Sequence, residues 1–337
     1  MVSFVLMGRQ FAVHSYNILA QNLARSSFFP LARTSSLSAT YRKELIKEKL
    51  SASMAKQAIV CLQELPAAWE EEFHLFLWEN GFDMVSAMYS SGKNSMGVAI
   101  AFPRQVFELS DTKSCRLAST LPVPWRTRID RSINKILSAL QEDQQPQAAD
   151  VWETAESRKN HIIAAKFKYK DDLNGKELCV GTYHMPCLFR KPPTMIIHGA
   201  LSAQYIQKYA GASPYVFAGD FNVRPKSPVY QLMTTGKIDE YNPEYPPPRV
   251  NDTWSANLNS PMGSAYLSVE GAEPDFTNYP AIKAYFCCTL DYIFFSEDSL
   301  SASEVISLPH RSKSRIMPNQ TQPSDHLLIG ATFQCKE

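Results

Sequence analysis

The stretch Val216–Met233 reads VFAGDFNVRPKSPVYQLM, and the fold is decided there. An apolar run, typical of a buried strand, ends at a carboxylate, Asp220, and an amide follows at Asn222. Because side chains alternate along a strand, we expect Asp220 and Asn222 to lie on one side and Phe221 to pack on the other. The prolines that follow mark a turn. Turn chemistry and a metal site both explain polar groups at this position.

Other apolar runs along the chain also begin or end at polar residues. These residues are Asn17, Glu64, His184, Asp291, Asp325 and His326. Each one alone has an ordinary explanation, such as a solvated loop residue, a turn former or a half-buried histidine. Together they offer carboxylate and amide oxygens, which suit Mg²⁺, and a histidine beside an aspartate, which suits proton transfer. The combination predicts metal-dependent phosphoryl chemistry.

Hydrophobic periodicity predicts alternating strands and helices, with hairpins in the later part of the chain. The expected strands are residues 11–17, 58–62, 96–102, 160–169, 177–184, 215–219, 290–296 and 327–333. The expected helices are residues 40–53, a helix opened by Pro66, and residues 194–209, and Asn174-Gly175 is expected to form a hairpin turn. This order predicts an α/β fold in which two packed mixed sheets are flanked by helices.

The chain shows no boundary between domains, so residues 1–337 are expected to form one catalytic domain. Residues 110–151 are polar and contain QEDQQPQ, which predicts an insertion or a mobile loop. Residues 240–285 contain YPPPR and show little periodicity. No internal repeat suggests a partner-binding repeat region.

Composition narrows the class of protein. The formal net charge is +1, which excludes a global basic field for gripping long nucleic acid, so phosphate binding must be local. The seven cysteines form no CxxC pair, which argues against a disulfide framework or a zinc ribbon and favours a reduced intracellular compartment. No signal peptide and no apolar run long enough for a membrane are expected, so we expect a cytoplasmic protein.

Six motifs, taken together, resemble the endonuclease/exonuclease/phosphatase superfamily. They are SYNILA (15–20), LQE (62–64), GTYH (181–184), GDFN (219–222), TLDYIFFS (289–296) and SDH (324–326). The resemblance implies the DNase I-like four-layer α/β sandwich. SYNILAQNL, the P-x-S-x-x-Y pattern after GDFN and EPDFTNY (273–279) are similar to the deadenylase, nocturnin, angel and 2′-phosphodiesterase branch.

The resemblance implies roles for the acidic and amide residues. Glu64 would be the principal ligand of Mg²⁺, with Mn²⁺ as an alternative, and Asn17 would lie beside it. Asp325 would lie close to the metal. Asp220 and Asn222 would position the attacking water and the scissile phosphate.

The resemblance also implies roles for the histidines and the substrate-binding residues. His184 would donate to a phosphoryl oxygen, and His326 would face the phosphate while Asp291 orients its imidazole. Candidate substrate-binding residues are Phe286, Phe189, Arg158 and Asn160. Phe286 is interpreted either as a platform on which a terminal base stacks or as a core aromatic.

The sequence therefore predicts a hydrolase of phosphate esters. The first interpretation is an Mg²⁺-dependent phosphodiesterase that degrades RNA from its 3′ end with a preference for adenine. A second is a phosphatase of a small adenine nucleotide or dinucleotide, which the low net charge favours because few phosphate contacts can be spread over the surface. A third is a catalytically inactive binding module.

Overall fold

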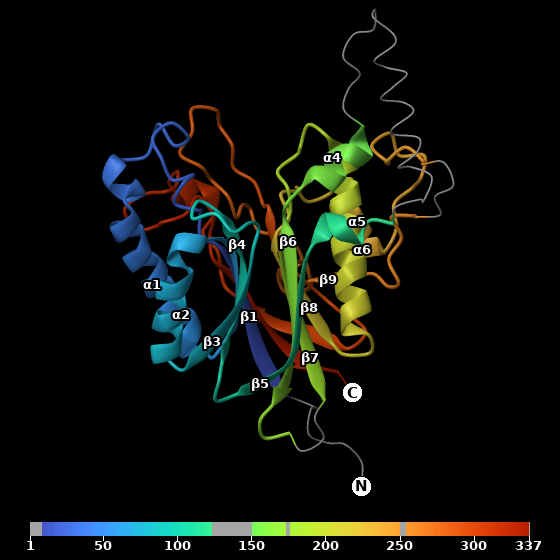
Figure 1. Cartoon of the computed structure of the whole chain (residues 1–337), viewed down its shortest axis with the longest axis horizontal. Helices are drawn as coiled ribbons and strands as arrows, with labels where there is room; N and C mark the ends of the chain where they lie inside the picture. The colour runs from blue at the N-terminus through green and yellow to red at the C-terminus, as the bar shows by residue number, and fades with distance from the viewer. Residues whose placement is uncertain (1–8, 123–149, 173–175, 250–253, 337) are drawn as a thin grey trace, which may run out of the picture.

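Two mixed six-stranded sheets pack face to face in the computed structural model, which describes residues 9–122, 150–172, 176–249 and 254–336 (Figure 1). The first sheet has the order β11 (Leu300–Val305), β12 (Ile329–Cys335), β1 (Gln10–Asn17), β2 (Ile59–Pro66), β4 (Met96–Pro103) and β3 (Phe82–Met88). The second has the order β5 (Phe107–Arg116), β6 (His161–Tyr169), β7 (Glu177–His184), β8 (Tyr215–Asp220), β10 (Asp291–Phe295) and β9 (Gly263–Ser264).

Helices cover the outer faces of both sheets, so the molecule has four layers (Figure 1). Helices α1 (Ala39–Ala55) and α2 (Glu70–Glu79) lie against the first sheet, and α5 (Pro192–Ala210) and α6 (Pro228–Thr235) lie against the second. Shorter elements are α4 (Val151–Ser157), α7 (Ala265–Glu270), η1 (Thr34–Leu37), η2 (Ala67–Trp69), η3 (Leu117–Thr120) and η4 (Arg311–Lys313). The predicted four-layer α/β sandwich is confirmed.

Each sheet has one parallel pair of strands at its centre. In the first sheet β1 and β2 run parallel and α1 makes the crossover; in the second β7 and β8 run parallel and α5 makes it. Parallel neighbours require such a crossover connection, which explains why the two long helices are placed there. The carboxyl ends of each parallel pair therefore finish at the same edge of their sheet.

The two sheets bury a shared apolar core between them. Alternate side chains such as Val13, Ile59, Val180 and Ala218 point into this interface and are fully buried. Toward the carboxyl ends of β2 and β7 the core contains polar side chains. There the Gln63 amide in β2 donates to Thr182 Oγ1 in β7 at 2.9 Å. This bond joins the two sheets next to the strand ends that carry the polar residues predicted above.

Several expected elements differ in the structure. Residues 110–116, expected to open an insertion or loop, belong to β5, because they pair with β6 across a polar, exposed edge that hides the strand alternation. Residues 123–149 of that segment, and the expected hairpin turn at Asn174-Gly175, lie outside the described residues. Pro66 ends β2 rather than opening a helix, and α2 begins at Glu70 after a short 3₁₀ turn.

The structure also bears on the cysteines and on possible membrane-spanning helices. All seven cysteines are free thiols. Within the described part of the chain, none of the helices has the length and apolar character needed to cross a bilayer.

Candidate active site

Three predicted site residues stand in a row across the ends of neighbouring strands. In the β7–β8 pair His184 lies opposite Asp220, and in the β8–β10 pair Asp291 lies opposite Asp220. All three are at least nine-tenths buried. Two carboxylates directly opposite each other repel, so this row needs positive charge nearby. The pKa of Asp220 is raised to about 6: burial raises it most, the charge of His326 opposes this, and the charge of Asp291 adds to it.

Glu64 reaches this row from the other sheet by means of a bulge. The β2–β4 register shifts between Gln63 and Leu65, and Glu64 adopts a left-handed φ of 58°. Regular alternation would have turned Glu64 toward the helices with Leu62, and Leu65 takes that place instead. A bulge re-aims a side chain at the cost of local strain, and both are common at functional sites.

Asn17 joins the carboxylates of the two sheets. Its amide nitrogen donates to Glu64 Oε1 at 3.1 Å and to Asp220 Oδ2 at 2.9 Å. Its amide oxygen accepts from the Leu19 backbone at 3.0 Å, so it is turned away from the acids. As placed, Asn17 bridges the two carboxylates through its nitrogen, whereas the role of metal ligand expected for it would need its oxygen.

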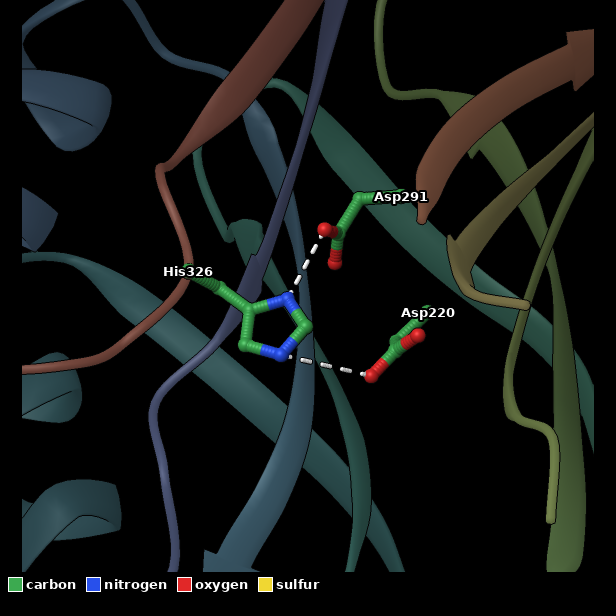
Figure 2. Close-up of side chains that lie close together, drawn as sticks. All are labelled: Asp220, Asp291 and His326. Carbon is green, nitrogen blue, oxygen red and sulfur yellow. Dashed lines mark hydrogen bonds and ion pairs between the residues drawn. The ribbon is translucent and has the colours of Figure 1, made fainter. Parts of the chain in front are cut away.

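His326 lies between two aspartates, as Figure 2 shows. Its Nδ1 is 2.8 Å from Asp291 Oδ2, and its Nε2 is 3.6 Å from Asp220 Oδ2. Burial lowers the pKa of His326, but the surrounding carboxylates, Asp291 foremost, outweigh burial and hold it well above its usual value. The ring is thus oriented at one nitrogen and charged at neutral pH, with the other nitrogen facing the strand-end row.

His184 faces the same carboxylates from β7. Its Nε2 lies 3.6 Å from Asp220 Oδ2 and 3.9 Å from Glu64 Oε1. Its Nδ1 is buried and makes no hydrogen bond with the part of the chain that the structure describes. A buried ring nitrogen without a partner is a group that a substrate oxygen or a water would satisfy.

Asn222 does not continue the strand, which corrects the expectation from alternation. Strand β8 ends at Asp220, and Asn222 has a left-handed φ of 52°. Its backbone donates to Asp220 Oδ1 at 2.9 Å, and its side-chain amide donates to the Met185 carbonyl at 2.8 Å. Asn adopts this conformation more readily than most residues because its short polar side chain bonds locally. Phe221 is fully buried in aromatic packing, as expected.

Two residues of the FTNY segment support the centre, although no role was predicted for them. Thr277 Oγ1 donates to Asp291 Oδ2 at 2.6 Å, and the Asn278 amide donates to Asp325 Oδ2 at 3.0 Å. Asp325 lies 4.0 Å from His326 Nε2, at the edge of the centre. The EPDFTNY segment already carried the family resemblance in the sequence, and that resemblance was the signal that could have assigned roles to Thr277 and Asn278.

Arg42 is a further residue that sequence reasoning missed. It is fully buried, and its guanidinium donates to the Pro323 carbonyl at 2.7 Å and to the carbonyls of Ile18 and Leu19. It thereby joins the segment after Asn17 to the segment before Asp325. Its position within a predicted helix gave no sign of this, because the contacts come from loops distant in sequence.

The two predicted aromatic residues are both at least partly exposed. Phe286 is half-buried, and the Arg224 guanidinium covers its ring at 5.5 Å. Phe189 is 69% exposed and carries Arg190 over its ring at 5.6 Å. Both rings are thus paired with a cation, an arrangement that suits contact with a base and a phosphate.

The two predicted polar substrate residues differ in position. The Asn160 amide donates to the His184 carbonyl at 2.8 Å, so it supports His184 through the backbone. Arg158 caps the end of α4, and its charge acts on His198 by lowering the pKa of that buried histidine, after the larger effect of burial. None of its described contacts joins it to the carboxylates.

The donor set fits a divalent cation at Glu64 and Asp220. These buried carboxylates share the Asn17 donor and therefore lie close together with an excess of negative charge. Asp220, Asp291 and His326 also bring ligand atoms within 4.8 Å of one another, but one nitrogen of His326 is already bonded to Asp291. Mg²⁺ prefers oxygen ligands, so the Glu64–Asp220 pair fits it better than the group that includes a histidine.

Known proteins resemble this chain in sequence and in fold. The family model described as "Endonuclease/Exonuclease/phosphatase family" matches residues 14–326. Carbon catabolite repressor protein 4 homolog 1 of Arabidopsis thaliana is 26% identical over 363 residues, which cover 96% of this chain and 57% of that protein. Human 2′,5′-phosphodiesterase 12 is 24% identical over 96% of this chain and 51% of its own. The chain thus spans about half the length of these curated relatives.

Solved structures show the same fold. ANGEL2 in complex with adenosine-2′,3′-vanadate superposes with a TM-score of 0.73 at 20% identity, covering 99% of this chain and 97% of that one. The human Nocturnin catalytic domain with bound sulfate superposes with a TM-score of 0.63 at 22% identity, covering 97% and 94%.

Proposed function

This chain belongs to the Endonuclease/Exonuclease/phosphatase family. We propose that it is a divalent-metal-dependent phosphodiesterase that cleaves RNA from the 3′ end with a preference for adenine. The observation that carries the proposal is the buried set formed by Glu64 from one sheet and Asp220 from the other, joined by Asn17. The name of one relative, 2′,5′-phosphodiesterase 12, supports a phosphodiester substrate, and the adenosine-2′,3′-vanadate bound to ANGEL2 supports an adenine nucleotide.

The charged residues divide the chemistry between them. A cation held by Glu64 and Asp220, with Asp325 at its edge, would neutralise the phosphoryl oxygens and lower the pKa of a bound water. Asp220, whose Oδ2 lies 3.6 Å from His326 Nε2, would orient the attacking water. Asn222 holds the other oxygen of Asp220 and so fixes the direction of that carboxylate.

The two histidines act on the phosphate. His326 is held cationic and pointed by Asp291, so its Nε2 can donate to a phosphoryl oxygen and stabilise the charge that develops there. His184 Nε2 approaches the same space from β7. The rings of Phe286 and Phe189 are proposed to stack on the terminal bases.

The test is a panel of substrates assayed with Mg²⁺ and with Mn²⁺. The panel contains 3′–5′ oligo(A), 2′–5′ oligo(A), oligo(U) and a phosphorylated adenine dinucleotide. We expect oligo(A) that carries its label at the 5′ end to be shortened stepwise, and faster than oligo(U). The reaction should be lost in His326→Ala. Lys336→Ala, which removes a distant surface cation, is the matched control. Release of phosphate from the dinucleotide alone would replace this function by that of a small-nucleotide phosphatase, and no reaction on any substrate would leave a binding module.

A further inference from the structure

A cavity lies between the loop after β1 and the loop before β12. Its volume is about 520 Å³. Residues 31–36 form one wall and residues 313–322 form much of the other, and Tyr41 closes the gap by donating to the Gln320 carbonyl at 2.8 Å. In Figure 1 the blue segment after β1 lies at the end of the molecule where that strand finishes. A space of this size is large enough for a nucleotide.

The cavity is positively charged. Arg33, Lys313 and Arg315 line it, and no carboxylate does so among the described residues. These three cations make no ion pair within the ranges that the structure describes, whereas the nearby Arg311, which is not part of the lining, pairs with Asp275 at 2.9 Å. Unpaired cations around a concave surface attract an anionic ligand.

The lining also has an apolar part. Leu31, Ile316 and Leu327 contribute it, and Leu31 is half exposed. Ligand sites commonly combine such an apolar surface with a few charged groups.

The cavity and the catalytic centre share one loop. Leu327 lines the cavity, and the preceding residue is His326. Ser324 in the same loop donates to the Asn17 carbonyl at 2.7 Å. The lining of the cavity therefore includes the residue that directly follows the catalytic histidine along the chain.

We propose that the cavity is a subsite for one nucleotide unit of the substrate strand, away from the scissile bond. Its phosphate would lie against Arg33, Lys313 and Arg315, and its base would lie against the apolar surface of Leu31 and Ile316. The inference rests on the proposed function, because it names where the strand lies once its end occupies the centre. It makes the enzyme selective for oligonucleotides over dinucleotides.

The test compares two substrates in the full chain. We expect Arg33→Ala, Arg315→Ala and their combination to lower the ratio of kcat/KM for oligo(A) of about ten nucleotides to kcat/KM for the dinucleotide ApA. Each lost phosphate contact should reduce the ratio about fivefold at 0.1 M salt and flatten the salt dependence by about 0.7 in slope. Arg311→Ala is the matched control: it removes one cation from the same segment outside the cavity, and the ratio should stay within about twofold of the wild type.

The outcomes separate the two proposals. If the wild type cleaves both substrates and the variants keep the wild-type ratio, the subsite is wrong while the proposed function stands. If Arg311→Ala lowers the ratio as much as Arg315→Ala, the general positive charge of this surface explains the effect and the subsite is wrong. If free AMP binds the wild type and not the Arg33→Ala/Arg315→Ala variant while the ratio is unchanged, the cavity holds a free nucleotide and the strand assignment is overturned. If the wild type cleaves neither substrate, the proposed function itself has failed.

Discussion

Asp220 is the residue at which the two sheets and the two histidines meet. It lies opposite both His184 and Asp291 in the ladder and accepts from Asn17 across the sheet interface. A carboxylate so deeply buried retains its proton to a higher pH than one in the unfolded chain. Its environment therefore makes the metal-free protein sensitive to pH in a defined direction.

We expect the metal-free protein to lose stability as the pH rises from about 4 to about 6 because of Asp220. The folded pKa is raised above the unfolded value of 3.8, so the folded state binds more protons in this window and the free energy of unfolding falls with pH. In urea unfolding with EDTA, the free energy of unfolding of Asp220→Asn relative to the wild type should increase by on the order of 1–3 kcal/mol across that range. The surface variant Asp298→Asn should track the wild type. A constant difference between Asp220→Asn and the wild type would contradict the assignment.

Asp291 acts through His326, and its removal should change a pH profile as well as a rate. Asp291→Asn should lower kcat by roughly 100-fold or more, because the imidazole loses the partner that fixes its orientation. Asp291 also raises the pKa of His326, so the alkaline limb of the rate profile should move to lower pH. A merely structural role would lower the amount of folded enzyme without moving that limb.

The polar residues at strand ends could be predicted from the sequence because an apolar run followed by a carboxylate is visible locally. Asp220 and His184 were predicted at strand ends for that reason. The left-handed φ of Glu64 could not be predicted, since glutamate rarely adopts it. Asn222 is of a residue type that adopts it more readily, but the sequence did not show that the strand ends at Asp220. Asp291 was expected beside His326, but its contact with Thr277 depends on a loop that shows no periodicity.

At the scale of elements, the β2 bulge and helix α1 together bring the first sheet to the centre. The bulge aims Glu64, and α1 places Arg42 where the segments after β1 and before β12 meet. Strands β3, β5 and β11 were missed or misread because edge strands expose polar side chains and blur the alternation. The central strands, which are buried on both faces, were visible as apolar runs.

Arg42→Met should destabilise the protein by about 3–5 kcal/mol, because several buried carbonyls lose their donor at once. Thermal unfolding followed by circular dichroism measures the change. Lys47→Met in the same helix is the control; its ion pair with Glu72 is partly exposed and should be worth under ~1 kcal/mol. Equal melting temperatures for the two variants would show that Arg42 does not hold these segments together.

At the scale of the whole molecule, neither sheet contains a complete centre. Glu64 and Asn17 belong to the first sheet, and His184, Asp220 and Asp291 belong to the second. The apolar interface between the sheets and the Gln63–Thr182 bond hold these halves in register. The four-layer sandwich thus gives the site a rigid support on two sides, which is what precise positioning of charged groups requires.

The most direct measurement is the rate of oligo(A) cleavage as a function of Mg²⁺ for the wild type and Glu64→Gln. The substitution keeps the size of the side chain and removes the charge that we assign to the cation. The account predicts no cleavage in EDTA, a rate that rises and saturates with Mg²⁺ in the wild type, and a loss of roughly 1000-fold in the variant at the same Mg²⁺ concentration. Cleavage that continues in EDTA, or a Glu64→Gln variant with the wild-type Mg²⁺ response, would contradict it.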